Sequence, residues 1–193
     1  MAIDSSVAYN LHNKYILASV GRVTWLKDYE TFIKSIAIVK KEIPDVVGLI
    51  VGGVREDKSD YYQSLKKLTT DLGIENSIIF TGSQTKISEI YFLSDIVVNA
   101  SLKMGNVGRT IVEALALNTP VIATTYDGLN NIVIDDVNGA IINVKDKEGL
   151  AQKIIKVKNQ NFNSIIDTIP KEFTLDSMVE NTVRVYTELC KDK

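Results

Sequence analysis

The chain has 193 residues, of which 45% are apolar and 24% charged, composition ordinary for one globular domain that buries its own core. The net charge of −2, with both signs interspersed, gives no support for the broad basic face that nucleic-acid binding requires. No apolar run reaches the roughly 18 residues of a membrane span, and the first fifteen residues lack the apolar core of a signal peptide. Cys190 is the single cysteine, so no internal disulfide can form, and we expect a cytoplasmic protein.

Continuous apolar runs alternate with segments of helical periodicity along the whole chain. The predicted strands are residues 15–20, 46–53, 77–82, 95–101, 121–124 and 139–144. The predicted helices are residues 26–43, 59–73, 87–93, 109–117, 146–159 and 175–190. Strands that are apolar throughout are typical of a parallel sheet covered on both faces. We therefore predict an α/β fold: a Rossmann-like, doubly wound, mostly parallel sheet of about six strands with helices on both faces.

The loops that follow the first four strands are the expected place for function, because open α/β sheets bind ligands beyond the carboxyl ends of their strands. After the first strand, "GRVTWLKD" places Gly21, Arg22 and Lys27 beside a helix start, which suits an anion. The loop matches neither G-x-G-x-x-G nor the phosphate-loop pattern, and a surface turn with two solvated bases is an equally good interpretation. We interpret Trp25 in this loop as a packing residue rather than one that stacks on a ligand.

The second and third loops give weaker signals. "GGVRED" follows the second strand, and its paired glycines suit either a tight turn or close approach to a ligand. "TGSQT" follows the third strand and includes Ser83, whose hydroxyl and neighbouring backbone groups could contact a nucleobase.

The loop after the fourth strand, within "SLKMGNVGRTIVEALALNTPVIAT", is the most informative. Gly105 and Gly108 leave backbone N–H groups accessible to an anion close to a helix start. Thr110 and Glu113 lie three residues apart on one helix face, and helical side chains lean toward the N-terminus. The Glu113 carboxylate can then accept hydrogen bonds from two vicinal hydroxyls, as on a ribose. The alternative is a plain ion pair with Arg109, which would not explain the two glycines.

Taken together and in this order, these loops resemble glycosyltransferase family 4. The segments that carry the resemblance span almost all of the chain: "SVGRVTWLKDYETFIKS", "LIVGG", "IIFTGS", "SDIVVNAS", "GRTIVEALALNTPVIAT" and "DDVNGAIINV". The chain looks like the carboxyl-terminal, nucleotide-sugar-binding half of an enzyme with the two-domain GT-B fold. Residues 1–14, which contain "AID", would be the remnant of an interdomain linker, and residues 15–193 the single donor-binding domain.

The resemblance implies a role for each matched residue. Arg22 and Lys27 match the basic pair that holds the donor diphosphate, and Glu113 matches the second acid of the E-x7-E signature, which contacts the ribose. Thr110 matches the diphosphate-contacting helix start, and Ser83 the segment that reads the base. The catalytic candidates are Arg22, Lys27 and Glu113. The donor-binding candidates are Gly21, Ser83, Lys103, Gly105, Asn106, Gly108, Arg109 and Thr110.

The sequence departs from the family at the first acid of that signature, where Gly105 stands eight positions before Glu113. No acidic residue occurs between positions 96 and 112, so backbone groups, Lys103 and Asn106 would have to hold the transferred sugar. Two smaller departures are Asp28 and Asn118, at positions often held by glycine.

The resemblance implies that a UDP- or GDP-sugar is the donor, that a glycan or lipid-linked molecule is the acceptor, and that transfer retains the anomeric configuration. It implies no metal or other cofactor, in keeping with the lack of a D-x-D-like motif in a plausible loop. The acceptor-binding amino-terminal half would be missing, so the chain alone would be inactive, and any contact with a membrane surface would come through that half.

Gly105 favours the alternative of a non-catalytic nucleotide-binding or interaction module derived from the same fold. An epimerase or a phosphorylase half is disfavoured, the phosphorylase because no lysine is placed for pyridoxal phosphate. The sequence leaves open the sugar, the base, the acceptor and the oligomeric state.

Overall fold

The computed structural model describes residues 11–103, 108–125 and 132–191, and its centre is a six-stranded sheet in which every pairing is parallel. The strands are β1 (Tyr15–Val20), β2 (Val46–Val51), β3 (Ile78–Gly82), β4 (Ile96–Asn99), β5 (Val121–Thr124) and β6 (Gly139–Ile142). Their order, β3-β2-β1-β4-β5-β6, reverses between β1 and β4. The predicted doubly wound, Rossmann-like sheet is confirmed, and the reversal marks the point where such sheets bind ligands.

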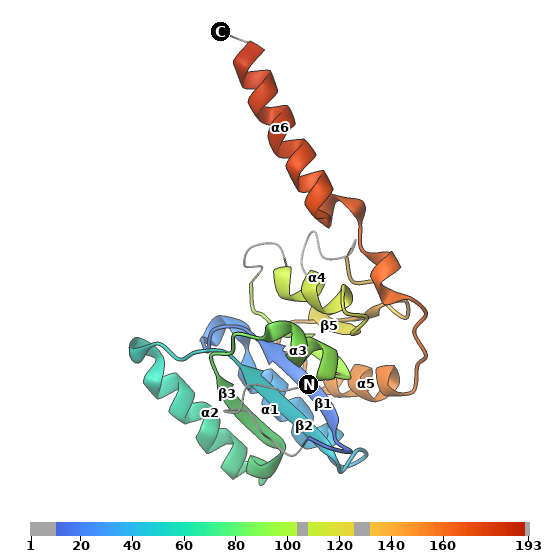
Figure 1. Ribbon diagram of the computed structural model, residues 1–193. Helices are drawn as coiled ribbons and strands as arrows, with labels where there is room; N and C mark the ends of the chain where they lie inside the picture. The colour runs from blue at the N-terminus through green and yellow to red at the C-terminus, as the bar shows by residue number, and fades with distance from the viewer. Residues whose placement is uncertain (1–10, 104–107, 126–131, 192–193) are drawn as a thin grey trace.

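Two layers of helices cover the sheet (Figure 1), and each layer has its own apolar cluster. The first face carries α1 (Tyr29–Val39), α2 (Ser59–Asp71) and α5 (Lys147–Lys158), and the second carries α3 (Ile87–Leu93) and α4 (Arg109–Leu115). Along β1, Leu17 packs into the first cluster, whereas Ile16 and Ala18 pack into the second. Alternate residues therefore serve opposite faces, which explains why the strands are apolar throughout.

The first helix begins later than the sequence predicted. Residues Trp25–Lys27 form a 3₁₀ turn, and α1 begins at Tyr29 instead of residue 26. Asp28 adopts a left-handed conformation with φ 48°, and its carboxylate accepts a hydrogen bond from the N–H of Thr31 at 3.4 Å. This cap places Lys27 on a tight loop at the carboxyl edge of the sheet, outside the helix.

Asn118 ends the segment that follows α4. It has φ 58°, and its side-chain oxygen accepts a hydrogen bond from the N–H of Ile166 at 3.0 Å. Asparagine tolerates this left-handed conformation, so the turn survives without the glycine often found there.

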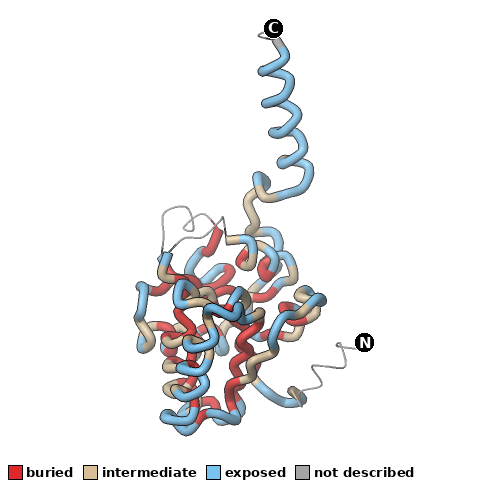
Figure 2. The backbone as a smooth tube through the Cα atoms, turned by 90° about the vertical axis from the view of Figure 1, so that its left-hand side faces the viewer, coloured by how far each residue is buried: buried red, intermediate tan, exposed pale blue. Residues whose placement is uncertain are grey.

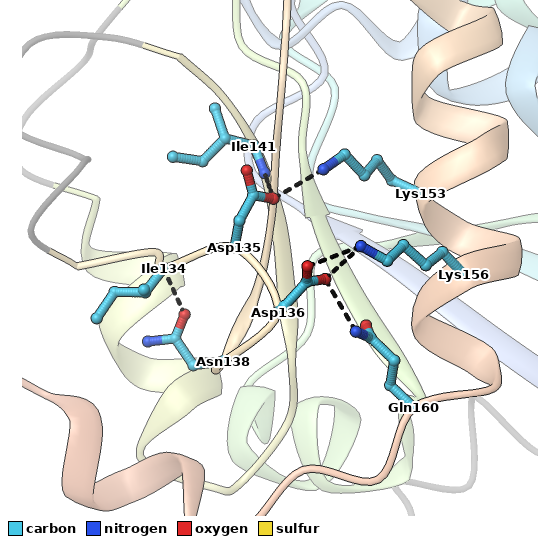
Figure 3. A network of polar contacts seen from close by, with 8 residues as sticks. All are labelled: Ile134, Asp135, Asp136, Asn138, Ile141, Lys153, Lys156 and Gln160. Carbon is cyan, nitrogen blue, oxygen red and sulfur yellow. Dashed lines mark hydrogen bonds and ion pairs between the residues drawn. The ribbon is translucent and has the colours of Figure 1, made fainter.

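The acidic turn before β6 is fixed to α5 by ion pairs (Figure 3). Asp135 accepts from Lys153 at 2.8 Å, while Asp136 pairs with Lys156 at 2.6 Å and accepts from Gln160 at 2.9 Å. These carboxylates are exposed, and their contacts give them a local structural role in tying an edge strand to its neighbouring helix.

The last helix, α6 (Leu175–Lys191), projects away from the sheet (Figures 1 and 2). Its described side chains are exposed apart from the half-buried Ser177. The large apolar side chains exposed on it are Leu175, Met178, Val179, Val183, Val185, Tyr186 and Leu189. At 100° per residue these positions fall on one face, so α6 is amphipathic and its apolar face is uncovered in this chain.

Two glycines let the ends of β1 and β2 meet at the carboxyl edge. The N–H of Gly21 donates to the carbonyl of Val51 at 2.8 Å, and a Cβ on Gly52 would lie 1.9 Å from the carbonyl oxygen of Gly21. Gly52 also has φ 157°, a value that side chains disfavour. The conformation of the first loop therefore depends on the absence of a side chain at position 52.

We predict that Gly52→Ala lowers the free energy of unfolding by about 3 kcal/mol, because overpacking and backbone strain add. Gly73→Ala is the matched control. Gly73 has φ 65° with open space around it, so this substitution should lower the free energy of unfolding by about 1 kcal/mol. Urea unfolding followed by circular dichroism measures both. Equal losses would show that the contact with Gly21 does not constrain the loop.

Candidate functional site

The loop after β1 brings Arg22 and Lys27 together. Arg22 is exposed, whereas Lys27 is half-buried with its side chain lying along Gly21. A Cβ on Gly21 would lie 2.7 Å from the Lys27 Cε, so only glycine leaves room for this path of the chain. The hydroxyl of the buried Tyr29 donates to the Gly21 carbonyl at 2.7 Å and fixes the turn from beneath.

The loop after β4 supports Lys27 from the other side of the switch point. The Lys27 ammonium donates to the Ser101 hydroxyl at 3.4 Å, and Ser101 donates to the Asn99 side chain at 2.6 Å. The N–H of Leu102 donates to the carbonyl of Leu26 at 2.8 Å. The first and fourth loops, which are separated by more than 70 residues, therefore form one surface at the carboxyl edge.

Burial lowers the pKa of Lys27 below its ordinary value, and the positive charge of Arg22 lowers it further. Two cations held this close repel each other, so the arrangement favours a bound anion that would interact with both.

Glu113 lies on α4, and its carboxylate contacts two described side chains. The hydroxyl of Tyr91, a buried residue of α3, donates to Oε2 at 3.0 Å. The Arg109 Nε lies 3.7 Å from Oε1, with 87% of the Arg109 side chain exposed and 44% of that of Glu113. The ion pair considered from the sequence is present, but an exposed pair at this distance contributes little. The hydrogen bond from Tyr91 is a partner that sequence spacing did not identify.

Ser83 lies beside the second loop of the carboxyl edge. It is exposed, and a Cβ on Gly53 would lie 2.5 Å from its hydroxyl oxygen. The N–H of Gly52 donates to the carbonyl of Gly82 at 3.0 Å. The loops after β2 and β3 are therefore adjacent. A surface that contacts a nucleobase beside the loop after β1 would need this arrangement.

The remaining donor-binding candidates lie on the segment that leads into α4. Lys103 is exposed, Gly108 immediately precedes the helix, and Thr110 is half-buried in its first turn. Gly105 and Asn106 lie outside the described residues.

Trp25 differs from the sequence interpretation. We expected a packing residue, but 51% of it is exposed in the 3₁₀ turn that precedes α1.

Two hollows lie away from these residues. One of about 480 Å³ is lined by Tyr15, Asp95 and Lys158 among others and opens at the amino-terminal edge of the sheet. The other, of about 540 Å³, lies between β6 and α5. Neither is lined by a predicted site residue. The carboxyl edge is a candidate site because of the charges of its side chains and not because of a deep cavity.

The loop after β1 supplies two cations that suit an anion. Separately, α4 carries a carboxylate that can accept hydrogen bonds from hydroxyl groups. Within residues 11–103, 108–125 and 132–191, no cluster of three or more His, Cys, Asp or Glu side chains is placed to hold a metal ion. Over the same ranges, no helix is both long and apolar enough to cross a bilayer.

We predict that Lys27→Met raises the thermal midpoint at pH 7. Because the pKa of Lys27 is lowered by folding, the unfolded chain holds this proton more tightly, and the charged form destabilises the folded state. That penalty is present below the folded pKa and disappears as the pH rises from it toward 10.5, so the advantage of the variant should shrink over that range. Lys41→Met, at an exposed lysine, is the control. A variant no more stable than wild type at pH 7 would contradict the burial cost.

Comparison with known proteins shows the family of the chain. The sequence matches the family described as "Glycosyl transferases group 1" over residues 4–168. A glycosyltransferase of Methanocaldococcus jannaschii is 31% identical over 173 residues, which is 88% of this chain and 43% of that protein. Alpha-monoglucosyldiacylglycerol synthase of Streptococcus pneumoniae is 29% identical over 195 residues, covering 91% of this chain and 42% of the synthase.

Solved structures agree with the sequence matches. The complex of HepE from Anabaena with UDP-glucose aligns with a TM-score of 0.72 and 27% identity over 77% of this chain and 40% of HepE. The C-terminal domain of the group 1 glycosyl transferase LpcC from Francisella tularensis shares the fold, with a TM-score of 0.72 and 24% identity over 83% of this chain and 87% of that domain. The chain spans less than half the length of these curated relatives. It belongs to the group 1 glycosyltransferases, family 4, and matches the carboxyl-terminal half of their GT-B fold.

Proposed function

We propose that the chain binds the nucleoside-diphosphate sugar for a retaining glycosyltransferase that transfers the sugar to a glycan or lipid-linked acceptor. The observation that carries this proposal is the pairing of Arg22 with the half-buried Lys27 on the loop after β1, at the point where the strand order reverses. The solved complex of the related HepE contains UDP-glucose, which makes a UDP-sugar the first donor to test.

In this proposal Arg22 and Lys27 hold the diphosphate. The bond to the sugar breaks with a gain of negative charge on the departing nucleoside diphosphate. The two cations would stabilise that charge, Lys27 from a position that its contacts with Gly21 and Ser101 already hold. Because Lys27 is already desolvated, its interaction with a phosphate oxygen is stronger than that of a fully hydrated lysine. These two residues therefore contribute more to the transition state than to ground-state binding.

Glu113 would accept hydrogen bonds from the ribose hydroxyls, and Ser83 would lie near the base. The sugar would be held by Lys103 and by the segment containing Gly105 and Asn106, of which the last two lie outside the described residues. With Gly105 in place of the first signature acid, we expect backbone groups to supply contacts that a carboxylate makes in relatives.

The acceptor would bind to an amino-terminal half, with residues 1–14 as the connection to it. We infer that this half covers the apolar face of α6, because the relatives are about twice as long as this chain and α6 leaves seven large apolar side chains exposed. In a protein that contains both halves, amide hydrogen exchange over Leu175–Lys191 should be slower than in this chain alone. Equal exchange rates would show that α6 stays uncovered.

A non-catalytic nucleotide-binding module is the second candidate, and Gly105 is the observation that favours it. Both candidates predict nucleotide binding at the same edge. Only the first predicts that a protein with both halves transfers sugar.

We predict that UDP, GDP or ADP binds this chain with a dissociation constant between micromolar and low millimolar, measured by calorimetry. Arg22→Ala and Glu113→Ala should each weaken binding by about tenfold or more, a loss of about 1.4 kcal/mol. Arg184→Ala, on the exposed face of α6, is the matched control and should bind as wild type does.

No binding of any of the three nucleotides would contradict the proposed donor site. Sugar transfer by this chain without another half would contradict its role as a donor-binding half.

A further inference from the structure

Tyr91 is buried in the second apolar cluster, yet its hydroxyl reaches the candidate site. The residue is 1% exposed, and its hydroxyl donates to Oε2 of Glu113 across the contact between α3 and α4. The Thr119 hydroxyl donates to the Tyr91 carbonyl at 2.8 Å, so the backbone at this position is held as well. Both the ring and the main chain of Tyr91 are therefore fixed before any ligand arrives.

The phenol remains a hydrogen-bond donor over the whole physiological range. Burial raises the pKa of Tyr91 well above its ordinary value, and the negative charge of Glu113 raises it further. A buried hydroxyl without a partner would be costly, and here its partner is the carboxylate that the proposed function assigns to the ribose.

We propose that Tyr91 is a positioning residue, which fixes the Glu113 carboxylate in the orientation that receives the ribose hydroxyls. This inference rests on the proposed function and adds a residue to it. Oε2 accepts a hydrogen bond from the Tyr91 hydroxyl and keeps a second lone pair, while the contact of Oε1 among the described residues is the exposed one with Arg109 at 3.7 Å. A ligand hydroxyl can therefore displace Arg109 with little loss, while the bond from Tyr91 stays in place.

The hydrogen bond from Tyr91 would raise the affinity for the ribose by lowering the entropy that Glu113 loses on binding. A free glutamate side chain samples many rotamers, and ordering it on binding reduces affinity. Holding the carboxylate in advance removes that loss, so deletion of the Tyr91 hydroxyl should weaken UDP binding by about two- to tenfold. The lost affinity should come from the contacts with the ribose hydroxyls, while the contacts with the diphosphate should keep their strength.

The test measures binding of UDP and 2′-deoxy-UDP by calorimetry to wild type, Tyr91→Phe and Glu113→Ala. We expect wild type to prefer UDP, Glu113→Ala to lose that preference, and Tyr91→Phe to reduce it. Tyr61→Phe is the matched control, because Tyr61 also donates to a glutamate, Glu30, at 2.6 Å but on the opposite helix layer. It should keep the wild-type preference.

The double variant Tyr91→Phe with Glu113→Ala separates positioning from a structural role. If Tyr91 acts through Glu113, removing its hydroxyl in the Glu113→Ala background should cause no further loss of affinity. A further loss there, or an unchanged ribose preference in Tyr91→Phe, would overturn the inference and leave the proposed function intact. Absence of nucleotide binding by wild type would overturn both.

Discussion

The half-buried ammonium of Lys27 is the constraint on which the site depends. It lies against Gly21 and beside Arg22, where burial and a neighbouring cation both oppose its charge. A protein gains no stability from such a pair, but it gains a place where an anion is attracted by two cations at once, one of which is held against Gly21. The glycines at positions 21 and 52 fit this constraint, because a Cβ at position 21 would meet the Lys27 side chain and a Cβ at position 52 would meet the carbonyl of Gly21.

The topology supplies the second requirement, which is that distant segments meet at one edge. Reversal of strand order between β1 and β4 makes their loops neighbours, and the hydrogen bonds Lys27–Ser101 and Leu102–Leu26 join them directly. Glu113 enters from the helix that follows the fourth loop, and it is held from the other helix of the same layer by Tyr91. Lys27 is thus held between two loops and Glu113 between two helices, so the cation and the carboxylate have separate structural support.

The features of this structure that depend on local hydrophobic pattern could be predicted from the sequence. Apolar runs identified all six strands, and the alternation with helices predicted the parallel, doubly wound sheet. The start of α1 was wrong by three residues, because helical periodicity cannot reveal that Asp28 takes a left-handed conformation and caps the helix. The exposure of Trp25 was also missed, because a loop position alone does not show whether an aromatic side chain packs or stays exposed. The contact of Tyr91 with Glu113 was missed because it joins two helices across 22 positions, and the sequence offered no more than an aromatic residue with a polar tip between apolar neighbours.

The most direct test of the account is a crystal structure of the chain bound to UDP. The account predicts that the diphosphate lies within hydrogen-bond distance of both Arg22 and Lys27 and that the ribose hydroxyls donate to Glu113. A nucleotide seated instead in the hollow at the amino-terminal edge, beside Tyr15 and Asp95, would contradict it.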